Sequence, residues 1–184
     1  MRNVSFICII TLMSLLSFSC DKYEMPYTPG VYADKKSLNE YKILWNNSNT
    51  KNYSYTYILE SYPPFHVVAD VTVRDGEVTF ILKEYNKKTD EEITDSDKTH
   101  FENSINNKAN LLIENIYTFI EDSIELALNS YNQKKDCYYA NFTFNFSDTV
   151  PFISYYKQES MIMLEDLDGN FGYKEIKIEN FEIQ

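Results

Sequence analysis

The chain has 184 residues, of which 43% are hydrophobic and 24% are charged. This composition excludes an intrinsically disordered chain and is sufficient for one domain with a single core. The formal net charge of −11 argues against a nucleic-acid partner, because an acidic domain repels phosphate backbones.

The first residues have the pattern of an export signal. Arg2 precedes an apolar stretch over residues 4–16, and small residues lead up to Cys20. Ser19 followed by Cys20 resembles the lipobox of bacterial lipoproteins, in which the cysteine thiol receives the lipid, although Ser17 stands where such boxes usually have leucine. An ordinary cleaved signal and a transmembrane anchor are the alternatives. The apolar stretch is shorter than the about 20 residues that span a bilayer, which disfavours the second.

These features predict the domain organisation. We expect residues 1–19 to be a lipoprotein signal peptide, residues 20–32 to be the lipidated Cys20 with a flexible tether, and residues 33–184 to form a single domain. Several acyl chains on one cysteine are enough for stable anchoring. The predicted location is therefore the cell envelope, with the membrane as partner through the lipid.

The cysteines leave no internal disulfide in this interpretation. Cys8 is removed with the signal and Cys20 carries the lipid, so Cys137 has no partner. We expect Cys137 to be buried at the start of a strand as a small apolar residue.

The first half of the domain reads as one helix and three strands. Residues 34–47 predict a helix, with Asp34 as N-cap and Leu38, Tyr41, Leu44 and Trp45 on one face. Residues 53–60 alternate as a strand does, and residues 66–85 form a hairpin around Asp75-Gly76.

The second half reads as one helix and three more strands. A charged loop is expected over residues 86–97, a helical pattern over 99–133, strands over 138–146 and 152–163, a turn over 166–172 and a last strand over 173–183. The predicted class is α+β, an antiparallel sheet with helices packed on one face, in the order α-βββ-α-βββ. No glycine-rich βα turn is present, and we expect no cofactor.

Part of this pattern resembles a known family. Trp45, residues 52–57, Pro63-Pro64 and the hairpin from Val71 to Val78 are similar to bacterial secreted and lipoprotein domains of the domain-of-unknown-function family numbered sixty-one seventy-four. The likeness covers about residues 38–156. It implies an envelope location and a small α+β fold, and no activity. Many members carry a Cys-x-Cys pair before the prolines, where this chain has Glu60-Ser61-Tyr62, so no thiol role is carried over.

Two groups of aromatic residues are candidates for a binding surface. Tyr53, Tyr55 and Tyr57 share one face of a predicted strand and could form a platform for sugar or peptide. The alternation is also what a strand with one face in the core produces. The same two interpretations, a binding platform or a core face, apply to Phe142, Phe144 and Phe146.

Other candidate sites are weaker. Asp166, Asp168 and Asn170, followed by Glu175, offer oxygen ligands for calcium, but their spacing departs from the EF-hand loop and favours a plain turn. His66 and His100 lack zinc-ligand spacing. No nucleophile and base are recognisable, so we expect a non-enzymatic module that binds an envelope protein or a small ligand. The alternatives are a structural or accessory subunit of an envelope complex and, third, a hydrolase.

Overall fold

The computed structural model describes residues 27–62, 64–89, 92–135, 137–164 and 167–184, and it is mixed α/β. An eight-stranded sheet, antiparallel except at β1, forms the body of the molecule. The elements in chain order are β1 (Gly30–Tyr32), α2 (Lys35–Ser48), β2 (Tyr53–Tyr62), β3 (Phe65–Arg74), β4 (Glu77–Tyr85), β5 (Lys88–Thr89), α3 (Asp95–Ser104), the 3₁₀ turn η3 (Lys108–Leu111), α4 (Ile113–Gln133), β6 (Tyr138–Phe146), β7 (Ile153–Leu164) and β8 (Leu167–Ile183).

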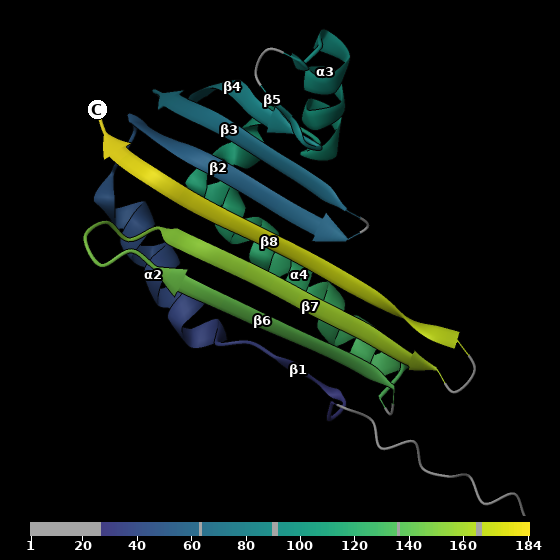
Figure 1. Cartoon of the computed structure of the whole chain (residues 1–184). Coiled ribbons are helices and arrows are strands. Elements are labelled where there is room, and N and C mark those ends of the chain that lie inside the picture. The colour runs from purple at the N-terminus through teal and green to yellow at the C-terminus, as the bar shows by residue number, and fades with distance from the viewer. Residues whose placement is uncertain (1–26, 63, 90–91, 136, 165–166) are drawn as a thin grey trace, which may run out of the picture.

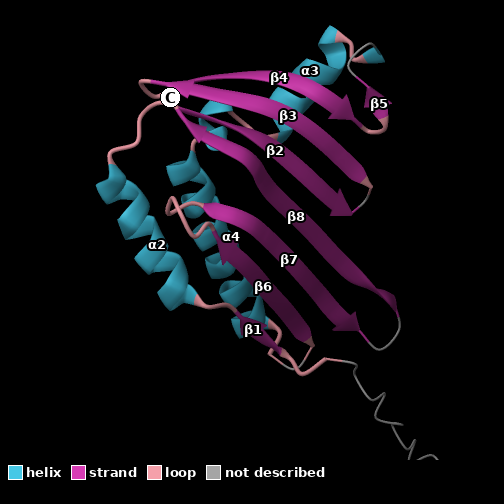
Figure 2. Ribbon diagram, turned by 60° about the vertical axis from the view of Figure 1, so that its left-hand side comes forward, coloured by secondary structure: helices cyan, strands magenta, loops and turns pink. Residues whose placement is uncertain are grey.

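The sheet is assembled from two separate parts of the chain. Its strand order is β1-β6-β7-β8-β2-β3-β4-β5, so the last strand lies in the middle between β7 and β2 (Figure 1). α2 and α4 run along the same side of the sheet, while α3 lies beside β4 and β5 (Figures 1 and 2). Among the described residues, no helix has the length and apolar character needed to span a bilayer.

α2 forms where the sequence predicts it. The carboxylate of Asp34 caps the helix by accepting a hydrogen bond from the backbone N–H of Ser37 at 3.0 Å. Leu38 and Trp45 are buried against the sheet. Leu44 is 52% exposed, so its predicted place on the buried face is wrong.

The tyrosine-rich strand β2 belongs to the core. Tyr53, Tyr55 and Tyr57 are only 1%, 3% and 5% exposed, so the hypothesis that they form a surface for ligands is wrong. Their hydroxyls serve the fold instead. Tyr55 donates to the carbonyl of Leu111, and Tyr53 accepts from the backbone N–H of Ile113 at 3.2 Å. Since α4 begins at Ile113 without a side-chain cap, β2 supplies the partner that the helix end needs.

The β3–β4 hairpin forms where the sequence predicts it, around Asp75-Gly76. Val67, Ala69, Val71 and Val73 are all buried on one face of β3. In the turn, Asp75 and Gly76 have φ of 49° and 85°. Left-handed backbone at both central residues defines the turn that suits the twist of two antiparallel strands.

The chain order departs from α-βββ-α-βββ in the first part of the domain. Gly30–Tyr32 forms β1, parallel to β6, and the ring of Tyr27 stacks on Tyr139 at 4.6 Å. The segment predicted as tether up to residue 32 therefore already belongs to the sheet at its end. β5 was predicted as loop. It forms because Asn86 and Lys87 both adopt left-handed backbone and reverse the chain after β4.

In the second half of the domain, the structure differs from the prediction at two further places. The single helical pattern over 99–133 is divided into α3, η3 and α4. Asn106 has a φ of 63° and the side chain of Asn107 caps η3, so this asparagine pair ends one helix and starts the next. The predicted turn over 166–172 is wrong for residues 167–172, because β8 begins at Leu167 and its pairing with β7 continues through Asn170 opposite Ile162.

The hydroxyl of Tyr55 gives a test of the link between β2 and the helices. We expect Tyr55→Phe to lower the free energy of unfolding by about 1–3 kcal/mol, because the buried carbonyl of Leu111 loses its donor. Tyr57→Phe is the matched control, since no hydrogen bond joins its hydroxyl to a described residue, and it should unfold close to wild type. Urea titration followed by circular dichroism measures both. Equal stability of the two variants would contradict the proposed role.

Candidate functional site

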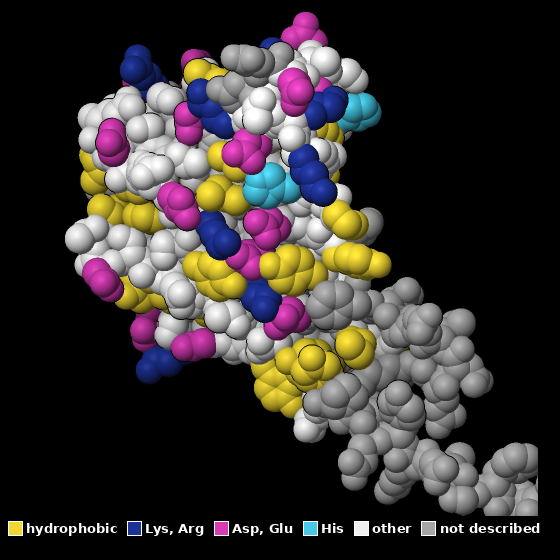
Figure 3. Space-filling model, in the orientation of Figure 1, with side chains coloured by type: hydrophobic (Ala, Val, Ile, Leu, Met, Phe, Trp, Pro, Cys, Tyr) yellow, Lys and Arg dark blue, Asp and Glu magenta, His cyan; other side chains and the backbone are white. Residues whose placement is uncertain are grey.

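The face of the sheet opposite α2 and α4 carries a row of ionisable residues that crosses four strands. Lys157 on β7 lies opposite Glu175 on β8, Glu175 lies opposite Glu60 on β2, and Glu60 lies opposite His66 on β3. We refer to these four residues as the cross-strand row. Figure 3 shows this face, where acidic, basic and hydrophobic side chains are intermixed.

Glu175 is the most buried member of the row, with 9% of the residue exposed. The hydroxyl of Tyr173 donates to Oε2 of Glu175, and Nζ of Lys177 lies 2.7 Å from its Oε1. Burial raises the pKa of Glu175, but the hydrogen bonds from Lys177 and Tyr173 outweigh it, so the net shift in pKa is downward. The carboxylate therefore stays ionised at neutral pH.

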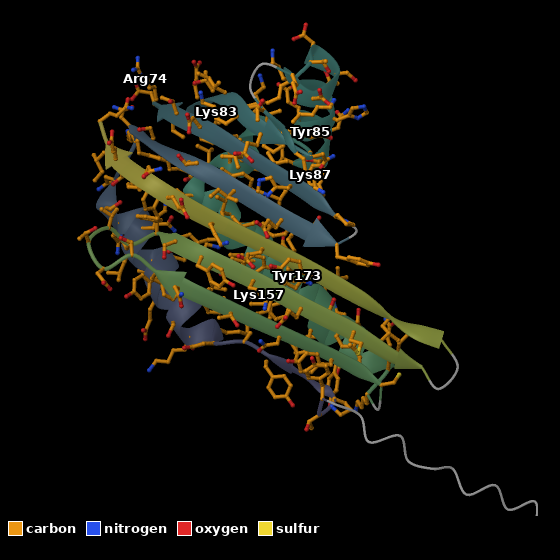
Figure 4. The ribbon with its side chains drawn as sticks, in the orientation of Figure 1. Arg74, Lys83, Tyr85, Lys87, Lys157 and Tyr173 are labelled. Carbon is orange, nitrogen blue, oxygen red and sulfur yellow. The ribbon has the colours of Figure 1, made fainter. Side chains whose placement is uncertain are left out.

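The basic residues are held by the acidic ones. Lys157 Nζ lies 2.8 Å from Glu159, and the same nitrogen stands 5.6 Å from the ring centroid of Tyr173. Figure 4 shows Lys157 and Tyr173 next to each other on β7 and β8. Hydrogen bonds to Glu159 and Glu175 raise the pKa of Lys157 and Lys177 respectively. These pairs offset the repulsion between Glu175 and Glu60, which carry like charges in direct register.

A shallow hollow of about 370 Å³ adjoins the row where β2 turns into β3. Glu60, His66, Lys87 and Tyr173 contribute to its wall. The two ring nitrogens of His66 face two carboxylates, with Nδ1 3.6 Å from Glu60 and Nε2 3.2 Å from Glu84. The remaining lining residues are Ser61, Pro64, Phe65 and Asn86.

The side chains around the hollow are suited to binding a small polar ligand. The hollow's acceptors, its donors and the ring of Tyr173 surround a volume in the lower part of the range for small-ligand pockets, about 300–1,000 Å³. Aromatic faces beside fixed hydrogen-bonding groups are suited to polar ligands that also present an apolar surface.

Apart from Glu175, the predicted site residues do not belong to the cross-strand row. Cys20 and Asp166 lie outside the described residues, and Asp168 and Asn170 lie on β8. Among the described residues, no three His, Cys, Asp or Glu side chains are grouped so that they could hold a metal ion. Cys137 immediately precedes β6 as predicted but is half-buried rather than fully buried.

Sequence reasoning missed the cross-strand row. Its signal is present, because Tyr173, Glu175 and Lys177 alternate with the buried Ile176 and with Ile178. Such alternation marks a strand with one face away from the core. The partners of Glu175 on β2 and β7 depend on the register of strands distant in sequence, which the pattern of one strand does not contain.

Comparisons of this chain with protein-family models, with curated proteins and with solved structures gave no match.

The burial of Glu175 leads to a prediction about stability. Glu175→Ala leaves Tyr173 and Lys177 without their acceptor, so we expect the free energy of unfolding to fall by about 1–3 kcal/mol. Glu159→Ala is the control, because it removes a more exposed carboxylate that pairs with Lys157, and we expect a loss below about 1 kcal/mol. Chemical denaturation of both variants checks this. A larger loss for Glu159→Ala would show that the hydrogen bonds of Glu175 do not stabilise the face.

Proposed function

We propose that this chain is a lipid-anchored binding domain of the bacterial cell envelope. In this proposal Cys20 carries the lipid, and the hollow beside the cross-strand row binds a small polar ligand rich in hydroxyl groups, such as a sugar. The observation that carries the ligand part is the hollow itself, where Glu60, His66, Lys87 and the ring of Tyr173 converge.

The amino-terminal pattern supports the anchor. A basic residue, an apolar stretch and small residues before Cys20 are the features of a lipoprotein signal. Tyr27, where the described chain begins beside Tyr139, is the seventh residue after Cys20. At about 3.3–3.6 Å per extended residue, this segment would hold the domain within about 25 Å of the lipid.

The arrangement of helices supports the choice of face. We infer that all of the helices pack on one face of the sheet. α2 and α4 lie on that side, and Phe101 of α3 has its ring 6.4 Å from that of Tyr57, a residue of the core face. None of the described helices then covers the opposite face, which presents the row and the hollow to solvent.

The anchor is tested by Cys20→Ala in cells that process lipoproteins. We expect the wild type in the membrane fraction, with the mass of the chain from Cys20 onwards plus acyl chains. The variant should lose the acyl mass and leave the membrane fraction, because a single exported domain has no other acyl chain to hold it. Intact-mass spectrometry and fractionation measure both. A wild type of unlipidated mass, or a variant that stays with the membrane, contradicts the anchor.

The hollow is tested separately with N-acetylglucosamine and glucose as probes. We expect amide chemical shifts to change around residues 60–66 and 86–87, and Lys87→Ala to weaken binding by about tenfold, the effect of one charged hydrogen bond. Lys51→Ala is the matched control, because Lys51 is exposed in a different loop. Shifts elsewhere, or equal affinity in the Lys87→Ala variant, would overturn the hollow as a sugar site and leave the anchor untouched.

A further inference from the structure

The outer edge of β6 is paired along only part of its length. β1 pairs with Tyr139–Asn141, and the chain then leaves the sheet toward α2. The other neighbour of β6 is β7. Over Phe142–Phe146, no described strand pairs with the outer side of β6. Alternate backbone N–H and C=O groups of this segment therefore point outward as a template for another strand.

A groove of about 590 Å³ runs along this segment, between β6 and the start of α2. Tyr41 stacks on Phe146 with ring centroids 3.8 Å apart, and Phe144 lies 5.9 Å from Phe146. These half-buried rings form an apolar wall on the helix side. On the opposite side of the strand, Thr143 and Asn145 are exposed. A strand added to this segment would therefore have apolar contacts for the side chains on one of its faces and polar contacts for those on the other.

This edge lacks the usual protection against strand addition. Proteins block exposed edges with charged residues or proline, and β6 contains neither over Tyr138–Phe146. The opposite edge of the sheet is different, because β4 carries Glu77, Lys83 and Glu84. β1 also demonstrates that the edge of β6 accepts an extended segment, and Phe142–Phe146 continues the same line.

We propose that Phe142–Phe146 binds an extended peptide of a partner protein as an added β-strand, with apolar residues facing Tyr41 and Phe144 and basic residues at the alternate positions. The basic character follows from charge complementarity, since the chain has a net charge of −11. The same charge disfavours a second copy of this chain as the occupant. Backbone hydrogen bonds supply affinity in this mode, and the groove selects the side chains. The proposal requires neither the lipid anchor nor the hollow.

The probe is an acetylated and amidated heptapeptide that alternates lysine with valine or phenylalanine. It is titrated into the ¹⁵N-labelled full chain in mild detergent micelles. We expect amide shift changes to concentrate on residues 141–146. The same peptide with every backbone nitrogen methylated should not bind, because it cannot donate to a strand. Shift changes confined to other elements, or equal binding of the methylated peptide, overturn the proposal.

A substitution at each sheet edge supplies the matched comparison. Thr143→Lys adds a charge to the exposed side of β6, and we expect it to weaken binding of the basic probe by about tenfold or more, equivalent to about 1.4 kcal/mol. Thr79→Lys places the same change on the exposed side of β4 and should leave affinity unchanged. Circular dichroism checks that both variants fold.

Three further results would overturn the proposal. Equal affinity of the wild type and the Thr143→Lys variant would show that the edge is not the site. A version of the probe with glutamate in place of lysine that binds as tightly would contradict the basic partner. A wild-type dimer in analytical ultracentrifugation that Thr143→Lys dissociates would identify a second copy as the occupant of this edge.

Discussion

The pairing of β8 with both β7 and β2 holds the sheet together. One part of the sheet comes from residues 53–89 and another from residues 138–164, and in the strand order they meet only through β8. β8 is the last strand in the sequence and the longest in the structure, so the sheet is completed by its C-terminal segment. Pairing across such sequence distances is entropically costly before the strands meet, and it is repaid by burial of residues such as Ile176 and Ile178.

The candidate site depends on the same strand. Tyr173, Glu175 and Lys177 lie on β8, and their neighbours in register come from both parts of the sheet. Glu175 is buried, which is costly for a carboxylate unless donors surround it. Tyr173 and Lys177 provide the donors from the same strand, two residues to either side. The donors to Glu175 thus come from β8 itself, while Glu60, His66 and Lys157 are the other members of the cross-strand row.

Sequence patterns predicted the elements that are determined by interactions between residues close in the sequence. Asp34 capped a helix and Asp75-Gly76 turned a hairpin, because capping and turn geometry act between near neighbours. The tyrosines of β2 show the limit of such patterns. Alternation identified the strand, but only the position of α4 and η3 determines that the tyrosine face is core and that the hydroxyls bond to Leu111 and Ile113.

The features that the sequence did not predict depend on contacts between distant residues or on unusual turns. β5 depends on left-handed backbone at Asn86-Lys87, a turn without the glycine that usually signals it. β8 extends through Gly169 because pairing with β7 outweighs the turn preference of the Asp-Gly sequence. Glu60 and Glu175 were not associated with one site, because they are neighbours only through sheet register. The sequence pattern therefore predicted most of the strands but did not predict which residues form the site.

The strand directions place the two proposed surfaces at different distances from the amino-terminal end of the described chain. β1 pairs with β6 from Tyr139 onward, so the amino-terminal segment enters at the end of the sheet where β6 starts. Tyr173 lies opposite Glu159, and Glu159 opposite Asn141, which puts the hollow about two residues, or about 7 Å, along the strands from that entry. Phe146 is seven residues from Tyr139, or about 23 Å. With lipid on Cys20, the hollow would lie toward the membrane and the open edge of β6 would extend away from it. A small ligand at the bilayer surface and a protein segment farther out could then be bound without competing for the same space.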